Sequence, residues 1–302
     1  MHAHPRIAMP PETRFLLPLY RERASFGDLT LEANRRKVAG RITGKGTKFE
    51  DLALDRKAVM DRIVAAPPTI GSAAGTVWRE FARSRGKVRW GEKRPSYWRD
   101  VDAILRMFPD AQIIHLVRDG RACVASLKHV HWWDTGIFGA MASWTMADTV
   151  LRRAQRRLPA NTYHRLRYED LLADPRTELT ALCAFLGENF HEAMLDHSSA
   201  AQDIVPRRKS WHDRTRGQLD QARIEAWRTA LDPEEIGLFE TVARRSLRRN
   251  GYERSGAGSQ PSGADLRGYY REWTRRAGVL SKERLTDARQ RRTYRQPMAD
   301  RG

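Results

Sequence analysis

Arg118 and Ser126 are the residues whose types and spacing best suit a chemical role, because together they could hold a phosphate group. Arg118 follows the apolar run 113–117, and the chain then turns at Gly120 into a segment rich in Ala and Val. This pattern predicts a buried parallel strand, a tight turn and a helix. Ligands of open α/β sheets bind at the carboxyl ends of the strands, where helix amino termini attract anions. An arginine there can donate two hydrogen bonds to a phosphate, and the Ser126 hydroxyl can add one more.

The same residues also fit an ordinary strand-to-helix junction. In that interpretation Arg118 pairs with Asp119 or another acid, and Ser126 lies on the helix surface. The local pattern alone does not choose between a phosphate site and a junction.

The elements that would position these residues alternate between strand and helix. Residues 88–93 and 163–168 predict two further short strands, and residues 97–108, 120–129, 137–158 and 175–186 predict helices. This order implies a parallel sheet with right-handed crossovers. Residues 16–85 predict mostly helix, including one over 70–83, and residues 224–231 and 233–247 predict two more.

Three segments resemble the PAPS-dependent sulfotransferases, in the bacterial branch related to tyrosylprotein sulfotransferases. PAPS is 3′-phosphoadenosine 5′-phosphosulfate, and PAP is the product that it leaves. The segments are residues 86–95 (GKVRWGEKRP), 111–126 (AQIIHLVRDGRACVAS) and 167–187, which holds RYEDLL and AFLG. The resemblance covers about residues 4–252. It implies a P-loop-NTPase-like parallel sheet flanked by helices, and transfer of a sulfuryl group from PAPS, without a metal, to a hydroxyl or amine acceptor.

The resemblance also implies roles for single residues. Arg118 and Ser126 match the pair that binds the 3′-phosphate of PAPS, and Tyr168 matches a residue that contacts the adenine ring. Glu12, in the context Glu-Thr-Arg, matches the catalytic glutamate that takes the acceptor proton. Lys93 matches the lysine that neutralises charge on the bridging oxygen as PAP leaves.

Simpler interpretations exist for three of these residues. Glu12 also fits an acid at a helix start after Pro10 and Pro11, Lys93 fits a surface lysine, and Tyr168 fits a tyrosine at a strand edge. Without the resemblance, the simpler interpretations of Glu12 and Lys93 would be preferred.

The beginning of the sequence departs from the family pattern. In the family, a strand and a loop rich in Gly, Arg, Ser and Thr precede the first helix and hold the 5′-phosphosulfate. Here His4-Pro5 already matches the end of that helix, and the Gly-Lys sequences at Gly44 and Gly86 follow no apolar strand. We therefore expect the first strand of the sheet to be missing, and an in-frame extension upstream of Met1 to encode it. Whether the 302-residue form is active depends on that expectation.

Composition limits the remaining possibilities. The net charge of +18 predicts affinity for anionic partners. Cys123 and Cys183 lie in apolar helical patterns without metal-ligand spacing, which favours free thiols in a reducing compartment. No apolar run is long enough to cross a membrane and no signal peptide is visible, so we expect a cytoplasmic protein.

The chain is expected to divide into a sulfotransferase-like domain, residues 1–252, and a linker with a basic tail, residues 253–302, that contains a short helix over 266–277. The cluster Arg152, Arg153, Arg156 and Arg157 is expected to complement a helix dipole. By resemblance, residues 203–219 form a lid over the nucleotide. His129 and His131 would bind a metal only with a third ligand, and none is apparent; a loop lining an acceptor cleft and simple core packing stay open.

Two other functions stay open. One is a catalytically inactive relative that binds PAP and acts as a binding module. The other is a nucleic-acid-binding protein, which is disfavoured because aromatic residues are not interleaved with the basic ones. The sequence does not identify the acceptor, which could be a carbohydrate, a tyrosine, a lipid or a small metabolite.

Overall fold

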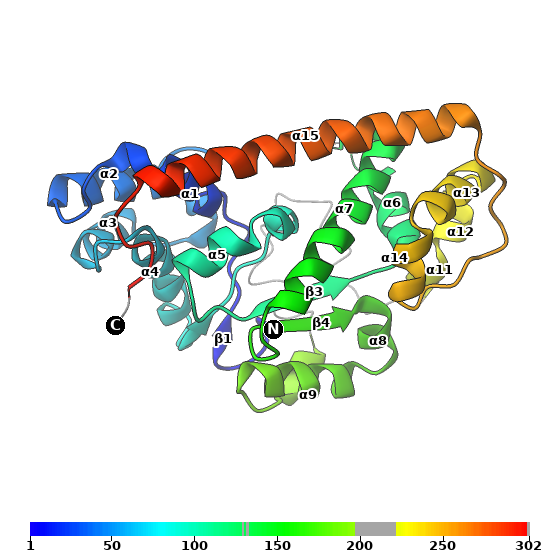
Figure 1. Cartoon of the computed structure of the whole chain (residues 1–302). Coiled ribbons are helices and arrows are strands. Elements are labelled where there is room, and N and C mark those ends of the chain that lie inside the picture. Colours follow the sequence, from blue (N-terminus) through cyan, green and yellow to red (C-terminus); the bar gives the residue numbers. More distant parts are fainter. Residues whose placement is uncertain (129, 131–132, 197–221, 301–302) are drawn as a thin grey trace. The chain divides into compact units, whose positions relative to one another are not determined.

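Strands occur as two parallel pairs in the part of the chain that the computed structural model describes, residues 1–128, 130, 133–196 and 222–300. β1 (Ile7–Ala8) pairs with β2 (Arg89–Trp90), and β3 (Ile113–Val117) pairs with β4 (Tyr163–Arg167). In the second pair Ile113 lies opposite Tyr163. The predicted α/β fold with parallel strands and flanking helices is confirmed (Figure 1).

The described residues form two units, each assembled from separate stretches of the chain. Unit 1 comprises residues 1–111, 186–196 and 286–300. Unit 2 comprises residues 112–185 and 222–285. Each unit contains one of the two strand pairs.

Unit 1 is mainly helical. Its elements besides the strands are α1 (Leu16–Glu22), η1 (Arg23–Phe26), α2 (Glu32–Ile42), η2 (Phe49–Leu52), α3 (Arg56–Ala65), α4 (Ile70–Arg83), η3 (Pro95–Arg99), α5 (Val101–Met107) and η4 (Glu192–Leu195). Side-chain caps begin two of the helices: Asp55 accepts a hydrogen bond from the Ala58 amide at 2.6 Å, and Thr69 accepts one from the Ser72 amide at 3.0 Å.

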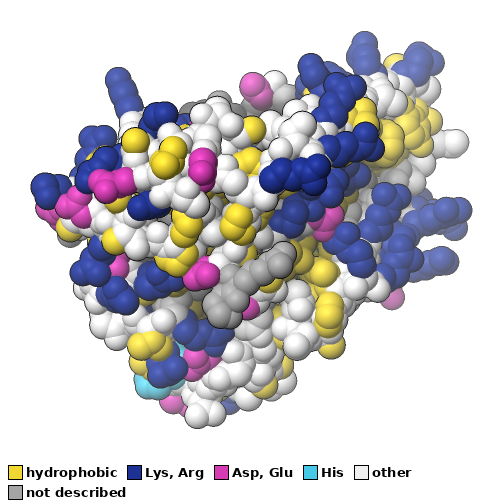
Figure 2. All heavy atoms as spheres, turned by 60° about the vertical axis from the view of Figure 1, so that its left-hand side comes forward, with side chains coloured by type: hydrophobic (Ala, Val, Ile, Leu, Met, Phe, Trp, Pro, Cys, Tyr) yellow, Lys and Arg dark blue, Asp and Glu magenta, His cyan; other side chains and the backbone are white. Residues whose placement is uncertain are grey.

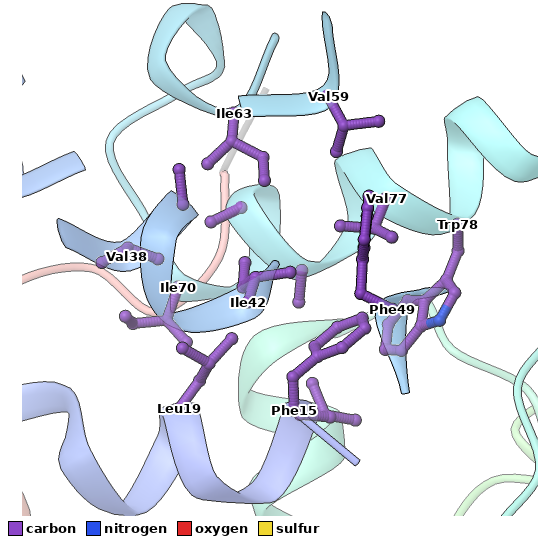
Figure 3. Packing of buried hydrophobic residues seen from close by; sticks show 14 of the residues in the cluster. Phe15, Leu19, Val38, Ile42, Phe49, Val59, Ile63, Ile70, Val77 and Trp78 are labelled. Atoms are coloured by element: carbon purple, nitrogen blue, oxygen red, sulfur yellow. The ribbon is translucent and has the colours of Figure 1, made fainter. Parts of the chain in front are cut away.

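The core of unit 1 forms around α4. Trp78 and Phe81 are 1% and 0% exposed, as expected from the helical pattern over 70–83. Figure 3 shows how side chains from α1, α2, α3 and α4 meet in this core, with Phe15 and Leu19 facing Ile42 and Val77. Gly71 allows a close approach, because a Cβ at that position would lie 2.2 Å from the Met107 carbonyl oxygen.

Unit 2 combines the pair β3–β4 with helices that pack against it. These are α6 (Gly120–Lys128), α7 (Gly136–Arg157), α8 (Tyr168–Ala173), α9 (Pro175–Leu186), α11 (Ala222–Glu225), α12 (Trp227–Ala230), α13 (Pro233–Val242), α14 (Arg244–Arg249) and most of α15 (Gly263–Thr293). Trp227, Phe239 and Leu247 are buried in its core together with Val124 of α6.

Several expected elements differ from the structure. The expected helix 97–108 is η3 followed by α5, and residues 224–231 and 233–247 each form two short helices. The expected short helix 266–277 is part of the 31-residue α15. Strand β1 was not expected, because two residues give no readable alternation. The expected lid over 203–219 and the residues His129 and His131 lie outside the described residues.

Candidate functional site

Glu12 and Lys93 lie close together in unit 1. They follow the carboxyl ends of β1 and β2, which are parallel neighbours. The Lys93 Nζ lies 3.8 Å from the Glu12 Oε2, and the Arg94 Nε lies 3.7 Å from the Glu12 Oε1. A third cation, the Lys48 Nζ, lies 3.9 Å from the same oxygen. None of these three distances is short enough for a hydrogen bond.

A partly buried acid, Glu92, fixes this arrangement. The Thr13 amide and hydroxyl donate to the Glu92 Oε1 at 3.2 and 3.0 Å. Burial raises the pKa of the Glu92 carboxyl, and hydrogen bonds from Tyr97 and Thr13 offset only part of that effect. Because Thr13 and Glu92 are the chain neighbours of Glu12 and Lys93, their hydrogen bonds hold those two residues side by side.

The group can do acid–base and electrostatic chemistry. A partly exposed carboxylate such as Glu12, with 25% of its side chain exposed, can accept a proton from a bound molecule. The Lys93 side chain is 66% exposed, so its ammonium group can reach a ligand and stabilise developing negative charge.

Arg118 and Tyr168 lie together in unit 2. Arg118 directly follows β3 and Tyr168 directly follows β4, and these strands are parallel partners, so both residues lie at one end of the pair. The Arg118 guanidinium carbon lies 4.8 Å from the centroid of the Tyr168 ring, a cation–π contact. Both side chains are half-buried. A cation stacked beside an aromatic ring can bind a phosphate and a nucleobase of the same ligand.

Glu169 ties the two strand ends together. Its Oε1 accepts the Asp119 amide at 2.9 Å, and its Oε2 accepts the Tyr252 hydroxyl at 2.8 Å. Burial raises the pKa of Tyr252, and the hydrogen bond to Glu169 raises it further. The backbone beside Arg118 is therefore fixed by the residue that follows Tyr168.

A buried network of ion pairs lies at the start of helix α6. Arg121 pairs with Asp119 at 2.7 Å and with Glu240 of α13 at 2.6 Å, and all three side chains are at most 7% exposed. Burial acts to raise the pKa of Glu240, but hydrogen bonds from Ser255 and Arg121 together lower it. The Asp119 carboxylate also accepts the Arg121 amide at 2.8 Å. Part of the amino terminus of α6 is thus occupied by the chain's own acid, whereas the sequence pattern suggested N–H groups open to a ligand.

Ser126 is the one expected site residue without a contact to the others. It lies on α6 and is exposed, and in the described part of the chain its hydroxyl has no hydrogen-bond partner. The hydroxyl is accessible to a ligand, and its use as a phosphate ligand stays a prediction.

The structure adds three residues that the sequence did not single out. Glu92 and Glu169 position their neighbours, and Arg94 adds a cation beside Glu12. Glu92 and Arg94 flank Lys93, and Glu169 follows Tyr168, so adjacency to an expected site residue was the available signal. No cluster of three or more His, Cys, Asp or Glu residues that could hold a metal occurs among the described residues.

Comparison with known proteins identifies the family. A family model described as "Sulfotransferase family" matches residues 1–192, which is more than half of the chain. The chain belongs to the sulfotransferase family. The strand ends that carry Glu12, Lys93, Arg118 and Tyr168 all lie within the matched residues.

Relatives of this sulfotransferase-family chain include characterised proteins. The nodulation protein NoeE of Sinorhizobium fredii is 26% identical over 281 residues, which cover 84% of this chain and 62% of NoeE. The human carbohydrate sulfotransferase 6 is 27% identical over 228 residues, which cover 66% of this chain and 56% of that protein. The chain thus spans less than two thirds of the length of either relative.

Solved structures share the fold. The sulfotransferase domain of the Synechococcus PCC 7002 olefin synthase superposes with a TM-score of 0.51 at 26% identity, over 80% of this chain and 86% of that domain. The sulfotransferase domain of the curacin biosynthetic pathway gives a TM-score of 0.51 at 19% identity, over 83% of this chain and 91% of that domain. No described helix of this chain is both long and apolar enough to cross a membrane.

Proposed function

We propose that this sulfotransferase-family protein transfers a sulfuryl group from PAPS to a hydroxyl or amine acceptor. The proposal rests on the position of four residues in the fold. Glu12, Lys93, Arg118 and Tyr168 each follow the carboxyl end of a parallel strand, where α/β folds bind ligands. In each unit two of them lie within 5 Å of each other.

The residues of unit 2 fit the nucleotide half of PAPS. The Arg118 guanidinium would bind the 3′-phosphate with help from the exposed Ser126 hydroxyl. The Tyr168 ring would contact the adenine. Since Arg118 already stacks on Tyr168, a phosphate bound by Arg118 would place the base within reach of the ring.

The residues of unit 1 fit the transfer step. PAPS supplies the sulfuryl group when it is bound. The Glu12 carboxylate would take the proton from the acceptor hydroxyl or amine, and the Lys93 ammonium would stabilise negative charge on the leaving oxygen. The Arg94 Nε lies 3.7 Å from the other oxygen of the Glu12 carboxylate, Oε1, and would attract that carboxylate through its charge.

The relatives narrow the acceptor classes. One is named a carbohydrate sulfotransferase, and another, from Mycobacterium, is named an omega-hydroxy-beta-dihydromenaquinone-9 sulfotransferase. We therefore propose a hydroxyl of a carbohydrate or a lipid-like molecule as the first acceptors to test. The second of these relatives matches only 34% of this chain, so the carbohydrate class ranks first.

The test is transfer of ³⁵S from labelled PAPS to a panel of carbohydrates, lipid alcohols, tyrosine peptides and small metabolites. The protein would be expressed as the 302-residue chain. Label appearing in an acceptor together with stoichiometric PAP supports the proposal. A folded protein that binds neither PAPS nor PAP contradicts it.

A further inference from the structure

Unit 2 carries the same arginine pattern on two helices. The sequence Arg-Arg-x-x-Arg-Arg occurs as RRAQRR at 152–157, the end of α7, and as RRSLRR at 244–249, the whole of α14. Arginines at i and i+4 on a helix are neighbours and repel each other. Each helix therefore carries two pairs of arginines that repel each other, and neither six-residue segment contains an Asp or Glu that would offset the charge.

The two helices pack against each other. Asp148 of α7 accepts hydrogen bonds from the Arg249 Nη2 at 3.1 Å and from the Asn250 Nδ2 at 2.7 Å. Asp148 is buried, whereas Arg153, Arg156, Arg245 and Arg248 are exposed. The charge of Arg249, followed by burial and then by Arg156 and Arg153, lowers the pKa of Arg152. The two arginine groups are therefore close enough to act on one another.

The helix dipole does not account for this pattern. A cation stabilises a helix only in its last turn, and of the α7 group only Arg156 and Arg157 lie there. Helix α14 has six residues, so Arg244 and Arg245 lie at its amino end, where positive charge is unfavourable. The expected dipole role covers at most half of the eight arginines.

The outer α7 arginines of the group are distant from the proposed nucleotide residues. Trp144 of α7 donates to the Arg118 carbonyl oxygen at 3.1 Å. Arg156 is twelve residues further along the same helix, about 18 Å away at 1.5 Å per residue. The α7 arginines precede β4, whereas Arg118 and Tyr168 follow β3 and β4, so this half of the group belongs to the opposite end of the strands. Helix α14 ends nearer to the nucleotide residues, because Tyr252, three residues after Arg249, donates a hydrogen bond to Glu169.

We propose that the arginine surface of α7 and α14, defined by Arg152, Arg153, Arg156, Arg157, Arg244, Arg245, Arg248 and Arg249, binds an acidic polysaccharide. Guanidinium groups pair with carboxylate and sulfate groups in a planar, two-bond geometry. A flexible chain with such groups at regular intervals can follow the rows of arginines. Lys and Arg side chains are numerous on the face drawn in Figure 2, in keeping with the net charge of +18.

The chemistry of the surface favours a polysaccharide over two other polyanions. None of the exposed large apolar residues of the described chain lies on α7 or α14, so the surface has nothing to insert into a lipid bilayer or to stack on bases.

The test measures binding of fluorescent oligosaccharides to the full chain. The probes are a sulfated heparin oligosaccharide and a carboxylated oligogalacturonate, titrated at several salt concentrations. The variants are Arg153→Gln with Arg156→Gln on α7, and Arg245→Gln with Arg248→Gln on α14. The matched control is Arg267→Gln with Arg271→Gln, two exposed arginines one turn apart on α15.

Each double variant is expected to weaken binding about tenfold, and to lower the slope of log affinity against log salt by about 1 to 2. The control, which removes the same charge, is expected to change affinity less than about twofold. Thermal melting should show that both test variants are folded at least as stably as the wild type, since they relieve repulsion.

Three results would overturn the inference. One is unchanged affinity of the folded double variants. The second is an equal loss in the α15 control, which would mean that net charge alone sets binding. The third is tighter binding, through the same arginines, of duplex DNA or of vesicles with anionic lipid than of either oligosaccharide.

Discussion

At the scale of single residues, the proposed function depends most on the position of Glu12. Its carboxylate lies within 4 Å of Lys48, Lys93 and Arg94, yet none of these cations is at hydrogen-bonding distance. A carboxylate held by charge and not by direct hydrogen bonds can rotate to meet an acceptor proton.

The Glu12→Gln substitution removes the proposed proton acceptor and keeps the shape of the side chain. We expect sulfuryl transfer to fall by about 10²–10⁴-fold, the usual contribution of a general base. PAP affinity should stay within about twofold, because Glu12 and the nucleotide residues lie on different strand pairs. Initial rates with ³⁵S-PAPS measure the effect, and Glu32→Gln, an exposed acid on α2, is the control. Undiminished transfer by Glu12→Gln would remove Glu12 from the mechanism.

The sequence pointed to the residues expected to contact a ligand, but not to the residues that position them. Arg118 could be read from its place after an apolar run, since charge at the end of a buried strand is informative. Glu92 and Glu169 could not, because an acid in a polar segment gives no sign that it will be partly buried and hydrogen-bonded. Only the folded chain shows Glu92 holding Thr13, and Glu169 holding Asp119.

At the scale of elements, the start of α6 requires a glycine at position 120. A Cβ at Gly120 would lie 2.2 Å from the Phe239 Cζ and 2.7 Å from the Trp144 Cδ2. Only glycine lets the helix begin this close to α7 and α13.

We expect Gly120→Ala to destabilise the protein by about 1–3 kcal/mol, the usual cost of overpacking, and to weaken PAP binding because Arg118 is two residues away. Urea unfolding and calorimetry measure the two effects. Gly278→Ala on α15 is the matched control: a Cβ there meets nothing within 4 Å, so stability should rise slightly. Equal stability of the two variants would contradict the packing argument.

A histidine in the pair β3–β4 is expected to make the stability of the protein depend on pH. The Tyr163 hydroxyl lies 2.8 Å from the His115 Nδ1 across the two strands. Burial, aided by the nearby charge of Arg165, lowers the pKa of His115 to about 4 from its ordinary value near 6.5. Between about pH 4 and pH 6.5 the His115 side chain is protonated in the unfolded chain but not in the folded chain. The contribution of His115 to the free energy of unfolding is therefore complete above about pH 6.5 and is lost as the pH falls towards 4.

The loss is expected to be on the order of 3 kcal/mol across this range. In His115→Gln, which keeps a hydrogen-bonding group but does not titrate, this part of the pH dependence should disappear. Urea unfolding at pH 4.5 and pH 7 measures both proteins. If the two proteins lose the same stability between these pH values, His115 is not the titrating group.

The elements with strong local signals were predictable. Helix α4 has the bounds 70–83 that its pattern gave, and α9 runs from Pro175 to Leu186 before Gly187, whose φ of 71° suits glycine. Elements fixed by tertiary contacts were not. β1 is two residues long and exists because the Arg6 and Ala8 carbonyls accept the amides of Arg89 and Gly91.

At the scale of the whole molecule, the chain returns to unit 1 at its end. Asp287 lies 2.9 Å from the Nη2 of Arg23, whose side chain is 1% exposed, and 3.0 Å from the Nη2 of Arg106. The Gly71 amide donates to the Met298 carbonyl oxygen at 2.9 Å. Residues 286–300 are thus part of unit 1, which an expected boundary at residue 252 did not suggest. Sequence composition marked the linker but could not show which part of the chain the last residues would contact.

Asp287→Asn should destabilise unit 1 by about 3 kcal/mol, because the buried Arg23 would lose its charged partner. Hydrogen exchange at the amides of α1 and α5 would report the change locally, and Asp300→Asn, an exposed acid of the same segment, should leave it unaffected. Unaltered exchange in Asp287→Asn would show that the end of the chain does not stabilise the unit.

The most direct test of the proposed function is calorimetric titration of PAP into the 302-residue chain and its Arg118→Ala variant. We predict that the wild type binds PAP and that Arg118→Ala weakens binding by about 1.5–3 kcal/mol, the range for hydrogen bonds to a charged group. Ser126→Ala should cost about 0.5–1.5 kcal/mol, since its hydroxyl is neutral. Arg271→Ala, a control on the exposed face of α15, should cost nothing measurable. Equal PAP affinity for wild type and Arg118→Ala would contradict the assignment of the nucleotide site to the ends of β3 and β4.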